Sequence, residues 1–401
     1  MNSKYVNMIT VPQAIKILSD QGIMPKTKSL MIADCLHLVS AAPIIAPVDV
    51  PGFDNSAMDG YVFCFEDYKS NQPLVIRNEI QAGTHSLHPL QKGEATRIFT
   101  GAPIPPNGDT VVPQELVSIS NGEMHIQKEI AKYANIRPRG TQTSKGSLVL
   151  EKNTFLTAEY LGFLATLGIS EILVYAPPRV GIINTGKELV AAGQPLQPFQ
   201  IYESNGTFLS LALKSMGITP LFCSWIDDEH DVLKALVQQR LPDVDILLFT
   251  GGISVGDYDF VKPVLEELGA LQHFYKVKQK PGKPLYFGKL ENKAIFALPG
   301  NPSAVVACFH AYLKPYLWAA MGKPDVDKNL SGILINSYKK NSGLTHFVKA
   351  RVEHNMVEIL PNQLSYQMDA YSKANAFAVL PEDQEQFFSG EKVELIYFNQ
   401  P

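Results

Sequence analysis

The chain has 401 residues, of which 45% are apolar and 18% charged, so its composition is that of a folded protein with room for several domains. Its 35 basic residues are balanced by 39 acidic ones for a net charge of -4, which excludes a global positive field for binding nucleic acid or an anionic membrane. The first residues lack the apolar run of a signal peptide, and no stretch approaches the roughly 18 apolar residues of a membrane helix, so we expect a cytoplasmic protein.

The first and third segments of the chain are predicted to form one discontinuous, elongated N-terminal domain, residues 1–46 and 140–176. Apolar residues recur at helical spacing within 14–18 and within 30–38, which predicts two short helices. Leucines recur every three residues from 161 to 167 before a helix stop at Gly168. We therefore expect helices here, with extended chain between them.

Two further segments are predicted to be small β domains. Between 47 and 139, short apolar runs are separated by Gly, Pro and Asn. Between 327 and 401, short runs such as 347–352 and 393–398 occur without a long helix. Both patterns are typical of compact sheets with short strands.

Residues 177–326 are predicted to form an α/β domain around a parallel sheet, because strand-like runs alternate with amphipathic helices in units of about 40 residues. Gly217 and Gly269 stand where C-terminal helix caps belong, and Asn301 followed by Pro302 predicts the start of a helix that reaches 318. The expected strands are 180–183, 221–225 and 246–250, and the expected helices are 205–216, 228–239 and 259–268.

A glycine-rich turn, TGGISVGDYD at 250–259, follows the last of these strands. Glycine lets the backbone approach a ligand closely, and the free N–H groups of the next helix attract anions. Such a loop also lies at the carboxyl end of a strand, where ligands of open α/β sheets bind. The turn predicts a phosphate site, although a tight turn without a ligand would have the same sequence.

Two carboxylates, Asp257 and Asp259, follow these glycines. At an effective dielectric near 20, each would repel a phosphate about 4 Å away by about 4 kcal/mol, so a cation must intervene. Mg²⁺ is the natural candidate, with Asp227, Asp228 or Glu188 helping to hold it. Alternatively, these aspartates cap the helices that they precede.

A local positive patch is formed by Lys276, Lys278, Lys280 and Lys283 around Pro281–Gly282. In a strand the first three lysines would share one face, and the rigid turn would fix a lysine at the strand end. Lysines on an exposed edge strand are the alternative.

The first β domain carries two polar loops, 54–61 and 100–109, of the kind that often holds binding sites. The hydroxyl of Thr100 could bond an oxyanion. Turns without a function are the alternative for both.

Taken together, eight ordered segments resemble the molybdopterin molybdenumtransferases, the family of MoeA and of the gephyrin E domain. The segments are 54–61 (DNSAMDGY), 97–103 (RIFTGAP), 108–115 (GDTVVPQE), 135–140 (NIRPRG), 184–189 (NTGKEL), 250–259 (TGGISVGDYD), 280–284 (KPGKP) and 298–302 (LPGNP).

The resemblance implies an elongated four-domain subunit that forms a homodimer. Its MogA-like, three-layer α/β domain would hold adenylylated molybdopterin, and a partner subunit would complete the cleft. Such enzymes use Mg²⁺ and molybdate, cleave the adenylate to release AMP and form the molybdenum cofactor. A molybdopterin adenylyltransferase is an expected partner.

Carried over by position, the resemblance also implies roles for individual residues. Lys276 and Lys280 would face the phosphate and molybdate anions, and electrostatic positioning rather than a covalent nucleophile would dominate. The expected catalytic residues are Asp59, Thr100, Glu188, Asp259, Lys276 and Lys280; the substrate-binding residues Gly251, Gly252, Ser254, Gly256, Lys283, Asn301 and Ser365; and the metal ligands Asp227, Asp228, Asp257 and Asp259.

The sequence departs from the family pattern at three places. Thr141 and Gln142 replace an acidic pair, Asp369 and Ala370 stand in place of a serine pair, and Ala304 replaces a serine. These changes leave open a non-catalytic member that binds a pterin nucleotide or a partner protein. An adenylyltransferase of the related α/β family is a third hypothesis, against which the extra residues 1–176 argue.

Overall fold

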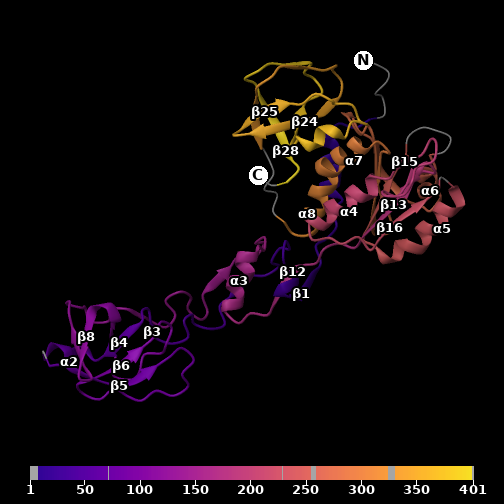
Figure 1. Ribbon diagram of the computed structural model, residues 1–401. Helices are drawn as coiled ribbons and strands as arrows, with labels where there is room; N and C mark the ends of the chain where they lie inside the picture. Colours follow the sequence, from indigo (N-terminus) through magenta and orange to yellow (C-terminus); the bar gives the residue numbers. More distant parts are fainter. Residues whose placement is uncertain (1–7, 71, 228, 254–258, 324–329, 400–401) are drawn as a thin grey trace.

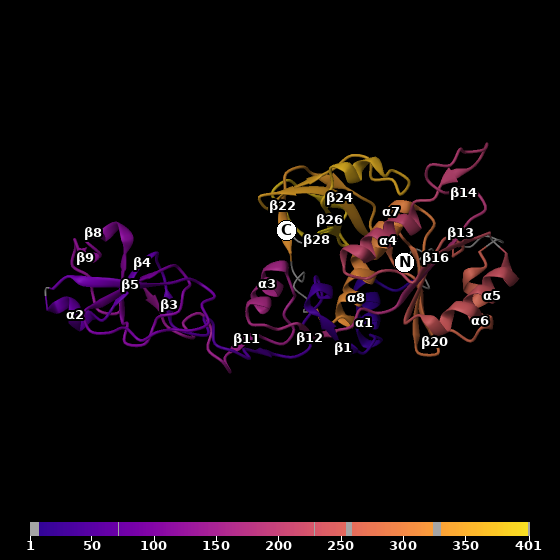
Figure 2. The ribbon, with the colours of Figure 1, turned by 60° about the horizontal axis from the view of Figure 1, so that its bottom comes forward.

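The computed structural model describes residues 8–399 except 71, 228, 254–258 and 324–329. The chain is elongated (Figures 1 and 2), with a small β domain at one end and the α/β and C-terminal domains side by side at the other. A slender segment of helix and strands joins the two ends. None of the described helices has the length and apolar character needed to cross a membrane.

The N-terminal segment confirms one predicted helix and overturns the other. Helix α1 (Val11–Asp20) begins with a capping box, in which Thr10 Oγ1 accepts from the amide of Gln13 at 3.3 Å and Gln13 Oε1 accepts from the amide of Thr10 at 2.8 Å. The helix predicted within 30–38 is wrong. That stretch instead forms strand β1 (Thr27–Met31), which pairs antiparallel with β12 (Glu171–Tyr175), and a short 3₁₀ turn (Ile32–Asp34).

The predicted helix near Leu161 is present as α3 (Ala158–Thr166), and Gly168 beyond its end has the expected positive φ of 73°. The slender joining segment is completed by β2 (Ile44–Ile45) paired with β11 (Leu148–Leu150), and by β3 (Asn55–Ser56) paired with β10 (Ile136–Arg137).

The small β domain has the sheet order β7-β4-β6-β5-β9-β8, with helix α2 (Phe65–Lys69) at its edge. Tyr61 and Phe63 face one apolar core, and Val62 and Ile98 face the other, as the alternation of a strand requires. The strands are β4 (Gly60–Phe63), β5 (Leu74–Ile80), β6 (Glu94–Ile98), β7 (Thr110–Pro113), β8 (Val117–Ser120) and β9 (Glu123–Ile126).

The α/β domain contains the predicted parallel sheet, in the order β16-β13-β17-β21-β20-β18. The strands β16 (Phe222–Ile226), β13 (Val180–Thr185), β17 (Ile246–Thr250) and β21 (Lys293–Leu298) run parallel, whereas β20 (Pro284–Leu290) and β18 (Leu271–Lys276) are antiparallel to their neighbours. A small excursion pairs β14 (Leu189–Val190) with β15 (Ile201–Tyr202).

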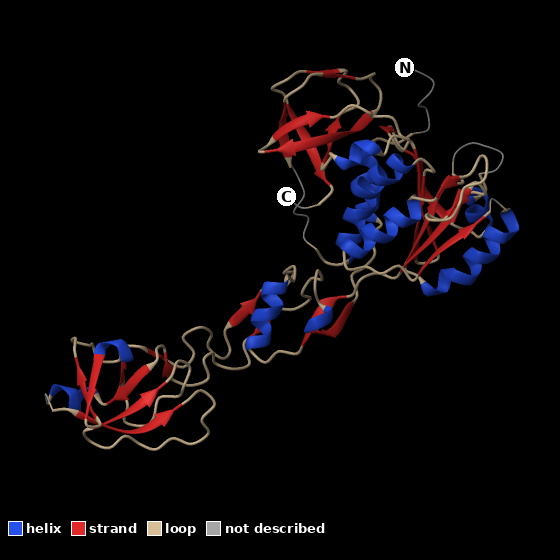
Figure 3. Cartoon of the chain, viewed as in Figure 1, coloured by secondary structure: helices blue, strands red, loops and turns tan. Residues whose placement is uncertain are grey.

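Helices cover both faces of this sheet (Figure 3). Ile182 and Leu248 belong to a core that includes residues of α4 and α7, while Ile183 and Leu247 belong to a core with α5 and α6. The helices are α4 (Asn205–Ser215), α5 (His230–Arg240), α6 (Val261–Glu267), α7 (Pro302–Cys308) and α8 (Lys314–Ala320), with a π turn (Phe309–Leu313) between the last two. The three-layer expectation is therefore confirmed, although the helix predicted from 303 to 318 carries this π turn.

The C-terminal domain is a β domain in which β24 pairs with both β25 and β26, so the sheet β24-β25-β22-β28-β26 closes on itself. Strand β19 (Gln279–Lys280), contributed by the α/β domain, adds to β24. The strands are β22 (Ser331–Leu334), β24 (Thr345–Glu353), β25 (Met356–Ile359), β26 (Ala376–Leu380) and β28 (Lys392–Tyr397), with β23 (Tyr338–Lys339) and β27 (Gln386–Phe387) as a separate pair.

Candidate functional site

A topological switch point falls at the carboxyl ends of β13 and β17, the place where open α/β sheets form a ligand crevice. The chain passes from β13 to β16 on one side and then to β17 on the other, so the crossovers leave in opposite directions at this point. Ligands of open α/β sheets bind at such a topological switch. Thr185 ends β13 and Thr250 ends β17, and Gly251 and Gly252 follow directly.

The two glycines are required by close packing between these strand ends. Gly251 and Gly252 have positive φ angles of 83° and 60°. A Cβ on Gly251 would lie 2.7 Å from the Thr185 carbonyl oxygen, and one on Gly252 would lie 2.9 Å from Thr185 Oγ1. The sequence predicted a close approach here, but in the described chain it is the neighbouring strand end that approaches the glycines.

Two buried side-chain oxygens lie near the ends of these strands. Thr185 Oγ1 and Asn205 Oδ1 are buried and have no hydrogen-bond partner within the described parts of the chain. Asn205 lies at the start of α4, and its side-chain Nδ2 donates a hydrogen bond to the Gly300 carbonyl at 2.8 Å. Because buried polar atoms are nearly always bonded, these two oxygens indicate a site for ligand or water. Neither residue was predicted; Thr185 lies within the 184–189 motif, which was its sequence signal.

The N-terminus of α4 is occupied by a carboxylate. Glu203 accepts from the amides of Gly206 at 2.5 Å and Thr207 at 3.3 Å, and from the Thr207 hydroxyl at 3.1 Å. Glu203 was also missed by the sequence reasoning. An anionic ligand must therefore use the other elements around the crevice.

Lys276 and Asp259 lie around Tyr275 beside the glycine turn. The Tyr275 hydroxyl donates to the Ile253 carbonyl at 2.5 Å, and Lys276 Nζ lies 5.0 Å from the centre of the Tyr275 ring. Burial raises the pKa of Tyr275, and the negative charge of Asp259 raises it further. Lys276 and Asp259 thus both lie near Tyr275, whose hydroxyl contacts the glycine turn at Ile253.

The lysine run crosses from one sheet to another. Val277 and Gln279 are buried, whereas the lysines between and beyond them are more exposed, which confirms the predicted alternation. Lys276 ends a strand of the α/β sheet, but Lys280 pairs with His346 of the C-terminal domain. Burial lowers the pKa of His346 to about 4, and the charges of Lys340 and Lys280 add to that lowering.

The turn after Lys280 is stabilised by the side chain of Gln279, whose amide nitrogen donates to the carbonyls of Pro281 at 3.1 Å and Gly282 at 3.0 Å. Gly282 has a positive φ of 88°, and Lys283 is exposed at this turn. From the sequence we expected the prolines to make this turn rigid. In the structure, the hydrogen bonds of the buried Gln279 side chain also fix it.

Asn301 and Ser365, far apart in sequence, are brought together. Asn301 precedes α7, and the amide of Ser303 in the first turn of that helix donates to the Ser365 carbonyl at 3.2 Å. Asn301 makes no side-chain capping bond, and Ala304, where the family pattern has a serine, is buried.

Only some of the predicted metal ligands lie within the described residues. Asp227 is exposed just beyond β16, and Glu188 is exposed beyond β13. Asp228, Ser254, Gly256 and Asp257 lie outside the described residues. Among the residues that are described, no group of three His, Cys, Asp or Glu side chains could hold a metal ion.

Asp59 and Thr100 form a separate cluster in the small β domain. Asp59 Oδ1 accepts from the Thr100 amide at 2.8 Å and from its hydroxyl at 2.7 Å. These two bonds lower the pKa of Asp59, and the charge of Arg97 lowers it further. Figure 1 places this domain at the opposite end of the molecule from the α/β sheet, so one chain alone does not bring the two clusters together.

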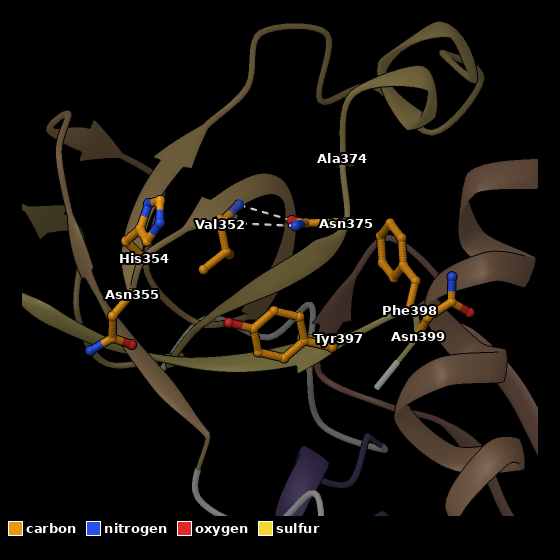
Figure 4. A pocket seen from close by; sticks show the side chains of 8 residues that line it. All are labelled: Val352, His354, Asn355, Ala374, Asn375, Tyr397, Phe398 and Asn399. Carbon is orange, nitrogen blue, oxygen red and sulfur yellow. Dashed lines mark hydrogen bonds between the residues drawn. The ribbon is translucent and has the colours of Figure 1, made fainter. Parts of the chain in front are cut away.

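A cavity of about 430 Å³ lies elsewhere, in the C-terminal domain (Figure 4). Its polar lining is satisfied in part, because Asn375 exchanges hydrogen bonds of 2.8 and 2.9 Å with the backbone of Val352. None of the predicted site residues lines this cavity.

Fold and site together define an elongated multidomain protein with an α/β domain that has a topological switch point at the carboxyl ends of its parallel strands. Residues 9–168 match the MoeA N-terminal region (domain I and II), 181–319 match the "Probable molybdopterin binding domain" and 331–398 match the MoeA C-terminal region (domain IV). The chain belongs to the molybdopterin molybdenumtransferase family, and it is accordingly a transferase of molybdenum cofactor biosynthesis.

Individual relatives match along nearly the whole chain. A molybdopterin molybdenumtransferase of Haemophilus influenzae is 34% identical, covering 98% of this chain and 99% of the relative. One of Bacillus subtilis is 33% identical, covering 97% and 94%. The crystal structure of a molybdopterin biosynthesis MoeA protein from Pyrococcus horikosii matches with a TM-score of 0.82 at 28% identity, covering 98% of this chain and all of that one (100%).

Proposed function

We propose that this chain inserts molybdenum from molybdate into adenylylated molybdopterin and releases AMP. The observation that carries the proposal is the crevice at the ends of β13 and β17, where Thr185 Oγ1 and Asn205 Oδ1 are buried without partners in the described chain. Lys276, which lies near Tyr275, and Lys280 would face the phosphate and molybdate anions, and Lys283 would help to bind the substrate. Catalysis would then depend on positioning and charge stabilisation.

The proposal includes Mg²⁺, which commonly takes one or two carboxylates together with phosphate oxygens and water. Asp227 follows β16 directly, and Asp259 follows the glycine turn after β17; these parallel strands flank β13, and both residues are the described candidates. Asp228 and Asp257 are close to them in sequence, and Glu188 follows β13. The ion would supply positive charge to the phosphates. The described residues do not by themselves form a metal cage.

The proposal also includes a homodimer. Asp59 and Thr100 lie at the far end of the chain from the crevice, so they would reach it from a second copy. A molybdopterin adenylyltransferase as the partner that delivers the substrate, and a cytoplasmic location, stay predictions.

The test is release of AMP from adenylylated molybdopterin, measured with molybdate and with tungstate in parallel. We expect release that depends on the oxyanion, and we expect Asp259→Ala to abolish it. Asp20→Ala, which removes an exposed carboxylate from α1, is the matched control and should leave the rate unchanged. If the rate of Asp259→Ala stays within about threefold of wild type, the role of Asp259 is wrong.

A member that binds without catalysis is the second candidate, favoured by the loop in which Thr141 and Gln142 replace an acidic pair. The Thr141 hydroxyl donates to the Pro138 carbonyl at 2.6 Å, so this side chain is turned into its own loop. Tight binding of adenylylated molybdopterin by wild type with no AMP release would support this candidate over the enzyme.

A further inference from the structure

Lys349 is a buried lysine in the middle of β24 that the sequence reasoning did not single out. Its side chain is among the largest fully buried ones, with 1% of the residue exposed. Its Nζ donates to the carbonyls of Asn362 and Gln367 at 2.7 Å each and of Leu364 at 3.3 Å. The three N–H groups of the ammonium are thus matched by three carbonyl oxygens of one loop, residues 361–368, named here the carbonyl loop.

Burying an ammonium group costs free energy, so we expect this lysine to have a specific role in the structure. A buried ammonium is tolerated only when its donors are bonded, and bonds from a charged donor are stronger than neutral ones. Lys349 Nζ also lies 5.3 Å from the centre of the Tyr371 ring, which attracts the cation. Burial lowers the pKa of Lys349, and the nearby carboxylate of Asp369 opposes that lowering.

The base of the carbonyl loop is tied to β24 independently of the ammonium. Gln363 Oε1 accepts from the Lys349 amide at 2.9 Å, and Gln363 Nε2 donates to the carbonyls of Lys349 at 2.9 Å and Leu360 at 2.7 Å. Removing the lysine side chain alone would therefore leave this end of the loop attached. The part released would be the outer stretch that carries Ser365.

That outer stretch touches the α/β domain at the start of α7. The Ser365 carbonyl accepts from the Ser303 amide at 3.2 Å, and the hydroxyls of Ser303 and Tyr371 are 2.9 Å apart. Asn301 and Gly300 stand two and three residues before Ser303, and a Cβ on Gly300 would lie 3.8 Å from the Cα of Gly251. Hydrogen bonds and sequence neighbours therefore link Lys349 to the vicinity of the glycine turn.

We propose that Lys349 is a positioning residue, which clamps the carbonyl loop onto the first turn of α7 and so fixes Ser365 and Asn301 at the rim of the substrate cleft. Since its donors are used by the loop, it acts through these residues and does not itself hold an anion. The loop clamp rests on the contacts alone, whereas its effect on catalysis rests on the proposed function.

The test uses Lys349→Met, which keeps the length of the side chain and removes its charge and donors, and Lys349→Arg, which restores both. Hydrogen exchange followed by mass spectrometry should show faster exchange in 364–368 and at the first turn of α7 in Lys349→Met, with protection regained in Lys349→Arg. In the AMP-release assay, KM for adenylylated molybdopterin should rise about tenfold or more in Lys349→Met with kcat changed less than about threefold, and Lys349→Arg should restore KM.

Lys293→Met is the matched control, because Lys293 Nζ likewise donates to a carbonyl, that of Val244 at 2.7 Å, at the amino end of β21 and away from the carboxyl ends of the parallel strands. It should change neither KM nor exchange at 364–368. Tyr371→Phe keeps the ring over Lys349 and removes only the hydroxyl that meets Ser303, and it should raise KM by about two- to fivefold. This milder variant carries the test if Lys349→Met does not fold.

The inference is overturned if exchange at 364–368 is unchanged in Lys349→Met, or if KM is unchanged in both Lys349→Met and Tyr371→Phe while wild type is active. A wild type that releases no AMP contradicts the proposed function instead. In that case, the exchange experiment still decides whether the clamp exists.

Discussion

Thr100 holds one oxygen of Asp59 with two hydrogen bonds, one from its amide and one from its hydroxyl. Thr100→Val keeps the shape of the side chain and the hydrogen bond from the backbone amide, but it removes the hydrogen bond from the hydroxyl. That lost hydrogen bond favours the ionised form of Asp59. We therefore expect the pKa of Asp59 to rise towards its ordinary value in this variant. If AMP release needs ionised Asp59, its rate on acidification should begin to fall at a higher pH in Thr100→Val than in wild type. Carboxyl-carbon NMR titration of Asp59 checks the pKa, and the pH profile of AMP release checks the rate.

Thr100→Ser retains the hydroxyl and is the control for this titration. An Asp59 pKa that is the same in Thr100→Val as in wild type would show that the amide alone sets it.

Single residues also show where sequence reasoning succeeds and fails. A glycine directly after a strand indicates that the backbone there lies close to a neighbouring group, so Gly251 could be predicted from the sequence. Thr185 and Asn205 could not, because the property that matters is a buried oxygen without a partner in the described chain, and burial is created by the fold. Lys349 could not be predicted for the same reason, since a lysine in a β strand normally indicates an exposed face.

Elements with strong local signals were predictable, and those decided by distant partners were not. The helix α4 and the strand β17 match their predicted bounds closely, because apolar periodicity and caps agree with their burial. Residues 30–38 have helical spacing, yet Thr27–Met31 pairs with Glu171–Tyr175, which lies more than a hundred positions away. Tertiary pairing of this kind overrides weak local preference.

The amino end of β17 joins three elements through one carboxylate. Asp245 accepts from the Arg179 amide at 2.9 Å, from the Arg179 guanidinium at 3.2 and 3.3 Å, and from Lys26 Nζ at 3.0 Å. Burial alone would raise the pKa of Asp245, but these bonds outweigh it and lower the pKa from 3.8 to about 2. The ionised carboxylate therefore stabilises the fold above pH 3.8, and this contribution is lost as the pH falls through about 2.

Asp245→Asn should lower the free energy of unfolding of the α/β domain by roughly 1–2 kcal/mol at pH 7, a value discounted for the partial exposure of the basic partners. The deficit relative to wild type should shrink as the pH falls from 3.8 towards about 2. Urea unfolding followed at several pH values measures both effects. Asp243→Asn, at an exposed carboxylate two positions away, is the control, and equal stability of the two variants at pH 7 would contradict the role of Asp245.

At the scale of the whole molecule, the small β domain is held away from the rest of the chain by a braced neck. Asp49 accepts from Arg139 Nε at 2.6 Å and from the Lys145 amide at 2.7 Å, and the Val50 amide donates to the Thr143 carbonyl at 2.8 Å. These bonds tie the outgoing and returning passes of the chain together. The family resemblance implied an elongated subunit, but no local sequence pattern predicted the bonds of this neck, because they join residues that are far apart in the sequence.

If Asp59 and Asp259 serve one cleft, the two residues must come from different subunits. Asp59→Ala and Asp259→Ala should each abolish AMP release as homodimers. Randomly mixed, they should recover about a quarter of the wild-type rate, because half of the dimers are mixed and each of these has one intact cleft out of two. The measurement is AMP release after co-expression with two affinity tags and isolation of the doubly tagged dimers, where the recovered rate should approach about half. A doubly tagged dimer without activity, formed from subunits that each fold, would place both residues in the same subunit's cleft. An active Asp59→Ala homodimer would instead remove Asp59 from the reaction. The comparison is decisive because each variant leaves the other cluster untouched.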